Sequence, residues 1–235
     1  MSTFAFSDEP QTLRIFNYAA DTQEFIGVSD AYIAPNTGLP ECCTTIEPPE
    51  CQRGFALTFN GETWLPVEDH RGKTAFDTDA GSEVQLHHLG PLPDNVTLLK
   101  PDNTFVRWDG KRWRPDIEKA RQAKVAEIKQ YRDRITADYI IIDDHHFHSD
   151  ANSRIQQLSL TKMGMAKQIP TGLMWQTKNH NLIELTNEIA ARFETETMAH
   201  DMRLFAAAQQ HIAAIEALTE VQAVMDYDYS SGWQP

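Results

Sequence analysis

The sequence is short of three things that would point to particular protein classes: long apolar runs, an excess of positive charge and paired cysteines. No apolar run reaches the roughly 18–20 residues that cross a bilayer, and the first residues lack the basic and apolar regions of a signal peptide. With 21 Lys and Arg against 34 Asp and Glu, the net charge is -13, which would repel nucleic acid phosphates. We therefore expect neither a membrane nor a nucleic acid as partner.

The three cysteines, Cys42, Cys43 and Cys51, fall within one short stretch. Adjacent cysteines are poorly placed to bridge each other, and a zinc site commonly needs a second pair that the sequence lacks. We expect free thiols, as in a protein of a reducing compartment.

The first half of the sequence predicts short β-hairpins joined by proline-rich connectors. Aromatic and β-branched residues flank turn residues within four stretches, residues 12–28, 54–67, 73–87 and 104–113. Asn60-Gly61 and Asp109-Gly110 predict type I′ turns, because both central residues of such a turn need a positive φ. The prolines of the connectors cannot donate hydrogen bonds within a sheet. Apart from the recurrence of a hairpin with Trp, we identify no internal repeat.

The second half changes to helical spacing. Residues 116–138 contain neither Gly nor Pro and place apolar residues on one narrow face, which predicts a connecting helix able to pack on a copy of itself. Ser153 and Gln156 form a capping box that predicts a helix through about Ile169.

Two further hairpins and two further helices complete this half. The hairpins are predicted from about Tyr139 to Asp150 and within residues 173–185. From Thr186, apolar residues recur at helical spacing as far as Leu218, which predicts a long helix. Thr219 with Gln222 predicts the cap of a last short helix.

These patterns together predict an α+β fold. The expected domains are a β-rich module of antiparallel hairpins over residues 1–114, a connecting helix over 115–138 and an α+β domain over 139–235. The length of 235 residues suffices for two such domains, each with its own core.

The strongest candidate for chemistry is residues 140–150, IIIDDHHFHSD, which hold three aspartates and three histidines. Strand alternation would place four potential zinc or iron ligands on one side, namely His146, His148, Asp144 and Asp150. Phe147 is the expected buried anchor, however, and Asp143-Asp144 suits a turn, because Asp side chains bond their own backbone. We therefore favour a polar hairpin over a metal site, and we expect no metal and no cofactor.

Motifs of catalysis fail on spacing. The run HRGKT at residues 70–74 ends like a phosphate-binding loop, but Val67 stands where that pattern needs Gly. No Gly-x-Ser-x-Gly motif occurs, and Glu68-Asp69-His70 is more typical of an acidic turn than of a base. We identify no catalytic residue and expect a non-enzymatic interaction protein.

The tryptophans of the first half permit two interpretations. Trp64, Trp108 and Trp113 lie at hairpin ends, where aromatic faces can stack on sugars or on a partner. We favour the alternative that they fill the core of a small sheet domain that lacks long apolar runs.

Several long strings of the first half are similar to one protein family. They are NYAADTQEFIGVSDAYIAPNTGLPECCTTIEPPE, GFALTFNGETWLPVEDHRGKTAFDT, LGPLPDNVTLLKP and WDGKRW, which together cover about residues 13–114. This stretch resembles the tail fibre assembly proteins of tailed bacteriophages. The second half, with Phe147 to Asp150 and Trp175, resembles a phage-associated domain of unassigned function.

The resemblance implies a chaperone that binds the C-terminal end of a tail fibre and promotes its folding and trimerisation. It implies action in the host cytoplasm, with some members retained at the fibre tip in the virion. The predicted partners are therefore the fibre and, through its helices, a further copy of the chain.

Two loops, residues 32–40 and 68–74, are our candidates for fibre contact, because they carry the densest family matches and mix apolar with charged groups, with Pro35 and Pro40 as the source of rigidity. The candidate residues are Tyr32, Pro35, Gly38, Leu39, Pro40, Asp69, His70 and Arg71. The alternative is that these loops only brace the sheet. A rival function is that of a fibre-tip adhesin binding host-surface glycan through its aromatic hairpins.

Overall fold

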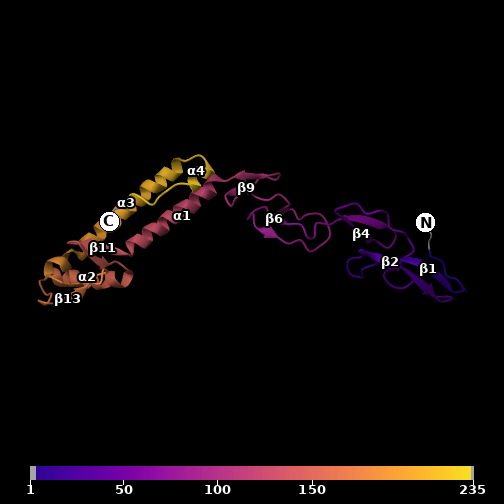
Figure 1. Cartoon of the computed structure of the whole chain (residues 1–235), viewed down its shortest axis with the longest axis horizontal. Helices are drawn as coiled ribbons and strands as arrows, with labels where there is room; N and C mark the ends of the chain where they lie inside the picture. The colour runs from indigo at the N-terminus through magenta and orange to yellow at the C-terminus, as the bar shows by residue number, and fades with distance from the viewer. Residues whose placement is uncertain (1–3, 234–235) are drawn as a thin grey trace. The chain divides into compact units, whose positions relative to one another are not determined.

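The computed structural model describes residues 4–233 and confirms an α+β fold. The chain divides into two compact units, of which the first ends at Trp113 and the second begins at Arg114. The first unit holds paired strands and long loops, and the second holds the helices (Figure 1). Within residues 4–233, no helix is long and apolar enough to cross a membrane.

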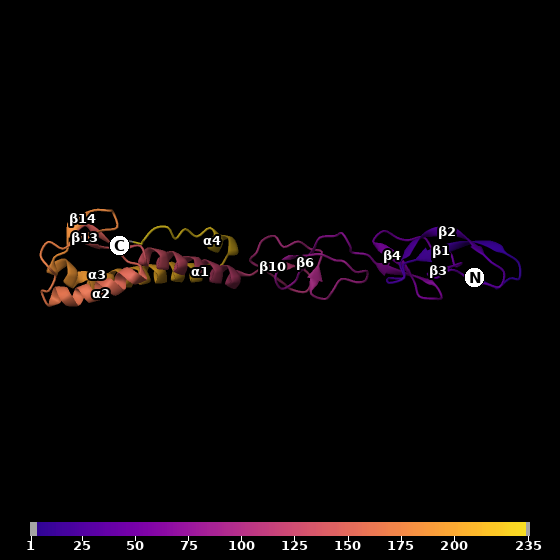
Figure 2. The ribbon, with the colours of Figure 1, turned by 90° about the horizontal axis from the view of Figure 1, so that it is seen from below.

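The first unit begins with a module of five strands. They are β1 (Gln11–Tyr18), β2 (Phe25–Ile33), β3 (Cys43–Thr44), β4 (Phe55–Phe59) and β5 (Trp64–Glu68). β1 lies between β2 and β3, and β4 pairs with β5 in a hairpin (Figure 2). The buried side chains of Phe16, Leu57, Phe59 and Trp64 form its core. Four aromatic or aliphatic side chains thus hold the two small sheets together.

A second module of five strands follows, none longer than three residues. They are β6 (Ala75–Asp77), β7 (Glu83–Val84), β8 (Val96–Thr97), β9 (Val106–Trp108) and β10 (Trp113–Pro115). β6 lies between β7 and β8, and β9 pairs with β10. The order of pairing therefore matches that of the first module strand for strand.

The predicted hairpins are confirmed, but the predicted type I′ turns at Asn60-Gly61 and Asp109-Gly110 are wrong. Each connection is four residues long, and only the glycine has a positive φ, 96° at Gly61 and 94° at Gly110. The Asn60 Oδ1 accepts hydrogen bonds from the amides of the residues two and three positions later, at 2.9 and 2.8 Å. The Asp109 Oδ1 does the same, at 2.9 Å for both amides. In each turn the hydrogen bonds of this side chain stabilise the backbone, so that only one residue needs a positive φ.

The equivalence of the two modules extends to side chains on their third strands. The Oγ1 atoms of Thr44 and Thr97 each accept a hydrogen bond of 3.2 Å from the amide two residues later. Thr44 pairs with Phe16 of β1, and Thr97 pairs with Phe76 of β6. Both threonines are buried, and the same hydroxyl-to-amide hydrogen bond follows the third strand of each module.

The tryptophans complete the equivalence. Trp64 Nε1 donates to the Ile46 carbonyl at 2.8 Å, and Trp113 Nε1 donates to the Leu99 carbonyl at 2.7 Å. In sequence, LPECCTTIEP over 39–48 matches LPDNVTLLKP over 92–101, and NGETWLP matches DGKRWRP. The internal repeat is therefore much more extensive than the recurring hairpin with Trp, and the sequence reading of no wider repeat was wrong.

The second unit is built from four helices and two hairpins. The helices are α1 (Ile117–Thr136), α2 (Ala151–Met165), α3 (Asn187–Ala217) and α4 (Val221–Met225). The hairpins are β11 (Tyr139–Ile142) with β12 (His145–His148), and β13 (Met174–Gln176) with β14 (Leu182–Glu184). Both hairpins and the long helix α3 were predicted, and Thr186 caps α3 by accepting from the Ile189 amide.

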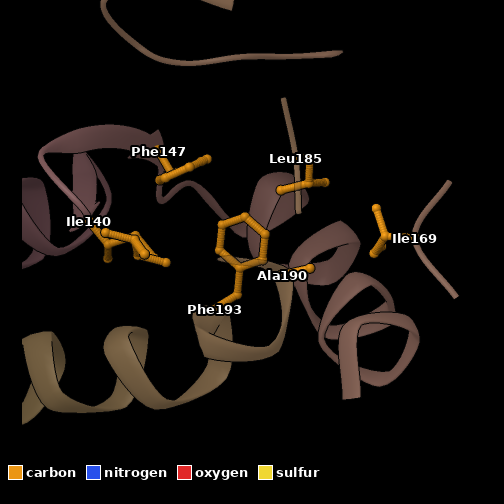
Figure 3. Close-up of a cluster of buried hydrophobic side chains, with 7 residues drawn as sticks. Ile140, Phe147, Ile169, Leu185, Ala190 and Phe193 are labelled. Carbon is orange, nitrogen blue, oxygen red and sulfur yellow. The ribbon is translucent and has the colours of Figure 1, made fainter. Parts of the chain in front are cut away.

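A buried apolar cluster joins the hairpins to the helices of this unit. Figure 3 shows Phe193 of α3 directed toward Ile140, Phe147 and Leu185. The rings of Phe147 and Phe193 meet edge to face, with centroids 5.0 Å apart. Phe147 is therefore the buried anchor that the sequence predicted.

Two predicted helix caps are wrong. α2 is capped by Asp150, not Ser153, because the Asp150 carboxylate accepts from the amides of Asn152 and Ser153 and from the Ser153 hydroxyl. α2 ends at Met165 and does not continue to Ile169. α4 begins after Glu220, which makes no side-chain capping bond, so Thr219 is not its cap.

The helix predicted as a separate connector packs within the second unit. α1 contacts α3 and α4, and it buries Ala120 and Ile128 (Figure 1). Its cap is Asp116, which accepts from the Lys119 amide. The Arg121 guanidinium also donates to the Leu218 carbonyl at 2.6 Å, which ties α1 to the end of α3.

Candidate functional site

The eight predicted contact residues fall into two separate places of the first module. Tyr32 lies near the end of β2, opposite Thr12 of β1, and Pro35, Gly38, Leu39 and Pro40 follow it in a loop. Asp69, His70 and Arg71 lie instead near the turn at the other end of the same hairpin, where Arg71 contacts Glu24. About seven strand residues, or roughly 20 Å, separate the two ends. The structure therefore does not bring the eight residues into one site.

Arg71 braces the first module. Its guanidinium donates to both carboxylate oxygens of Glu24, at 2.6 and 3.1 Å, and to both oxygens of Asp69, at 2.8 and 2.9 Å. Glu24 comes from the turn between β1 and β2, and Asp69 follows β5 directly. One planar cation thus joins two segments 47 residues apart in sequence.

The electrostatics around Asp69 follow from this clamp. The hydrogen bonds from the Arg71 side chain, supported by the Arg71 amide, lower the pKa of Asp69 to about 2. The Asp69 and Glu24 hydrogen bonds raise the pKa of Arg71 in return. His70 makes its own local contact, with its Nε2 2.7 Å from a Glu68 carboxylate oxygen. All three residues have partners within the module, as a brace requires.

The loop after β2 is held by short backbone contacts. The Asn36 amide donates to the Ser7 carbonyl at 2.7 Å, and the Thr37 hydroxyl donates to the Ala34 carbonyl at 2.7 Å. Pro35, Gly38 and Pro40 are exposed, whereas Leu39 is half-buried. The loop is therefore held in a defined conformation, and most of its exposed surface consists of polar side chains and backbone atoms.

The sequence reading missed the strand in front of this loop. β2 is an edge strand among residues 4–233, because only β1 pairs along its length there, and the bridge from Glu24 to Thr58 lies before it starts. Ile26, Val28 and Tyr32 are exposed on it. An edge strand presents unpaired amides and carbonyls, and exposed apolar side chains beside them mark a place where another strand can add. In the sequence, this exposed strand could have been recognised from the run FIGV, because it places an apolar residue on each face of the strand.

The histidine-rich hairpin of the second unit does not gather its acids and histidines. Asp143 and Asp144 form the turn, both with positive φ, and Asp143 pairs with Arg192 at 2.6 Å. Asp150 is committed to the α2 cap, where the Ser153 hydroxyl chiefly lowers its pKa. Across residues 4–233, no three His, Cys, Asp or Glu side chains are grouped to hold a metal ion.

The tryptophans of the first unit are engaged inside it. Trp64 is buried in the first core, and its ring meets Phe25 edge to face at 5.4 Å. Trp108 and Trp113 contact each other edge to face at 5.3 Å. Trp64 is therefore part of the core, as the core interpretation holds, whereas Trp108 and Trp113 are half-buried against each other.

Comparison with known proteins agrees with these two units. A family model described as the N-terminal domain of tail fiber assembly protein matches residues 4–67, and a domain of unknown function, DUF4376, matches residues 119–231. The prophage tail fiber assembly protein homolog TfaR of Escherichia coli (strain K12) is 42% identical over 134 residues, which are 56% of this chain and 70% of that protein. The chain belongs to the tail fibre assembly protein family.

Other members of the tail fibre assembly family are similar over shorter stretches. The tail fiber assembly protein of Escherichia phage lambda is 43% identical over 129 residues, or 54% of this chain and 66% of that protein. The tail fiber assembly protein of Enterobacteria phage T4 is 32% identical over 106 residues, which are 44% of this chain and 56% of that protein. No solved structure matches the chain. These relatives are named for fibre assembly, which supports a role of this kind for the chain.

Proposed function

We propose that the chain binds the C-terminal end of a phage tail fibre, promotes its folding and trimerisation, and uses β2 for the contact. The observation that carries the proposal is the nine-residue edge strand with Ile26, Val28 and Tyr32 exposed, in a module that matches the family's N-terminal domain. The relatives' names supply the fibre as partner.

The physical reason for such a contact lies in the fibre. A β-rich chain that must trimerise exposes unpaired strands and apolar surface beforehand, and these aggregate. Addition of a fibre strand to β2 would pair the backbone groups of both edges while the exposed side chains cover apolar surface. Formation of the trimer then competes with this pairing and releases the fibre end. In this account the chain acts in the host cytoplasm, where the fibre is made.

The proposal assigns different roles to the predicted residues. Tyr32 contacts the fibre as part of β2, and the loop that carries Pro35, Leu39 and Pro40 flanks that contact. Asp69, His70 and Arg71 brace the module and hold the hairpin that presents β2. This division replaces a single site made of both loops.

Co-expression of the full chain with the C-terminal segment of its cognate tail fibre tests the proposal. The test variant is Ile26→Lys with Val28→Lys, which leaves the β1 pairing intact but places two charges on the edge. The control is Leu65→Lys on β5, because Leu65 and Val28 are both 43% exposed. We expect soluble trimeric fibre with the wild type and the control, and a loss of at least about tenfold in complex, near 1.4 kcal/mol, with the double variant.

Two outcomes would contradict this account in different ways. A fibre that trimerises equally well without the chain, with no complex, would refute the chaperone function. Equal recovery of complex with the double variant and the wild type would leave that function in place but refute β2 as the contact. Circular dichroism of each variant confirms that it remains folded.

A further inference from the structure

The second unit carries an exposed apolar surface that its own fold leaves uncovered. It consists of five side chains on two helices, Ile155 and Leu158 on α2 with Met198, Met202 and Phe205 on α3, and we call it the α2–α3 face. Each of the five is between 49% and 65% exposed. A surface helix normally turns charged residues outward, so five large apolar side chains together need an explanation.

Four of the five side chains are linked by helical spacing or by a shared cavity. Met198, Met202 and Phe205 recur at spacings of four and three, which places them along one stripe of α3. Leu158 and Met198 line a common cavity of about 240 Å³ between the two helices. Ile155 lies one turn before Leu158 on α2. The stripe on α3 therefore continues across this cavity to Leu158 on α2, with Ile155 one turn away.

The surface exists because α2 covers only the first part of α3. At one end, Gly164 approaches α3 so closely that an added Cβ would lie 2.6 Å from the Ala191 amide nitrogen. At the other end, Arg154, in the first turn of α2, pairs with Asp201 at 2.7 Å. Beyond Asp201, the side of α3 that α2 covered continues as Phe205 without a covering helix.

The distribution of charge around the α2–α3 face favours a second copy of the chain as the binding partner. The chain has a net charge of -13, so two copies repel each other wherever acidic surfaces meet. α2 contains no acid, and from Met202 to Ile215 the only charged residue of α3 is Arg203. Arg203 makes no hydrogen bond or ion pair with another described residue. Glu194 and Asp201 line the cavity beside Leu158 and Met198, so two copies avoid acid facing acid here only in an arrangement that keeps these residues of one copy away from those of the other.

We propose that the α2–α3 face is where a second copy of this chain binds, through an antiparallel contact of the two α3 helices about a two-fold axis beside Met202. In this register Met198 lies opposite Ala206 of the other copy, and Phe205 lies opposite Ala199, so large side chains meet small ones. Arg203 lies near Asp201 of the other copy, a carboxylate that also pairs with Arg154 of that same copy.

The size of the face fits a homodimer. Five large side chains that are half to two-thirds exposed leave on the order of 500 Å² of apolar surface per copy, and a symmetric pair buries on the order of 1,000 Å², near the lower limit of specific interfaces. The contact is therefore expected to depend on concentration, and single charged substitutions on it are expected to have large effects.

Size-exclusion chromatography with light scattering over a concentration series of the full chain tests the proposal. Met202→Glu places two acids against each other at the axis while retaining a good helix former. The control is Leu182→Glu on β14, because Leu182 and Met202 are both 65% exposed. We expect a dimer for the wild type and the control, and a shift of the dissociation midpoint by at least about tenfold for Met202→Glu. A monomeric wild type at all concentrations, or an unchanged midpoint for Met202→Glu, would overturn the proposal.

Cross-linking tests the register separately. In a Cys51→Ser background, which removes the exposed thiol, Met202→Cys should be cross-linked between copies by a short bis-maleimide. Thr195→Cys should not, because its counterpart in the antiparallel pair lies about 14 residues along the helix axis, or roughly 20 Å away. Efficient cross-linking at position 195 with none at 202 would refute the antiparallel arrangement.

Discussion

In the first module β1 is flanked by the nine-residue strand β2, whereas in the second the equivalent strand β6 is flanked by β7, which has two residues. The four-residue turns, the buried threonines and the Trp hydrogen bonds are shared by both modules. These shared features satisfy backbone hydrogen-bonding groups within a small sheet, so they specify the strand arrangement that both modules have in common. The edge strand is the part that differs, and we assign the contact with the fibre to it.

The largest expected difference between the modules concerns their tryptophans. Trp64 is packed among Phe16, Phe59 and Tyr18, so Trp64→Ala should destabilise the first module by about 3–5 kcal/mol. Trp113 keeps the equivalent hydrogen bond but is only half-buried, so Trp113→Ala should cost less, about 2 kcal/mol. Amide exchange resolves the two modules within the intact chain. Equal losses of stability in the two variants would contradict the expectation that the more deeply buried tryptophan contributes more.

The turn glycines should behave alike. Gly61 and Gly110 have nearly the same positive φ, and no atom lies within 4 Å of a Cβ added to either. Ala at each position should therefore cost about 1–2 kcal/mol, from backbone strain alone. Gly38→Ala is the matched control, because Gly38 is not in the left-handed region and should change stability little. Denaturant unfolding measures all three, and a clear difference between Gly61→Ala and Gly110→Ala would contradict the equivalence of the turns.

The brace at Arg71 should have a smaller effect. Arg71→Ala removes hydrogen bonds to Glu24 and Asp69 that are partly exposed to solvent, so we expect a loss of about 1 kcal/mol. Arg71→Lys should recover only part of it, because an ammonium group cannot contact both carboxylates in the same planar geometry. Thermal unfolding measures the loss. Unchanged stability together with weakened fibre binding would show that Arg71 contacts the fibre directly, as the two-loop hypothesis held.

The smallest expected effects are those of acid and salt. The pKa of Asp69 is lowered from 3.8 to about 2 in the folded chain, so its stabilisation is complete above about pH 4 and is lost as the pH falls toward 2. The pKa of Asp77, at the end of β6 in the second module, is also lowered, chiefly by the amides of Ala80 and Asp79.

High salt should change the pKa values of these two carboxylates by different amounts. Salt screens the Arg71 cation beside Asp69, whereas Asp77 is stabilised mainly by backbone dipoles at hydrogen-bond distance. NMR titration of both carboxylates in low and high salt checks this, and we expect the pKa of Asp69 to rise more than that of Asp77. A larger rise for Asp77 would contradict this assignment of causes.

The sequence predicted the elements that depend on local pattern. The helix from Thr186, the hairpins around Asn60 and Asp143, and the burial of Phe147 follow from periodicity, caps and turn residues. It failed where two local signals competed. Asp150 and Ser153 can each begin α2, and the structure uses Asp150, whose carboxylate reaches two amides and the Ser153 hydroxyl.

The repeat was missed because its connections differ in length. Phe76 follows Phe16 by 60 residues, Pro93 follows Pro40 by 53, and Trp113 follows Trp64 by 49, so no fixed period exists for a pattern search to find. The bracing role of Arg71 stayed an alternative to fibre contact for a related reason. Its partner Glu24 is distant in sequence, and only tertiary structure brings the two together.

The most direct measurement of the central claim is hydrogen exchange of the full chain with and without its fibre partner. Pairing of a fibre strand with β2 predicts new protection of amides within Phe25–Ile33, with little change within the short β7 of the second module. Protection confined to residues 34–40 and 68–74, with β2 exchanging as in the free chain, would contradict the edge-strand account and restore the two loops as the contact.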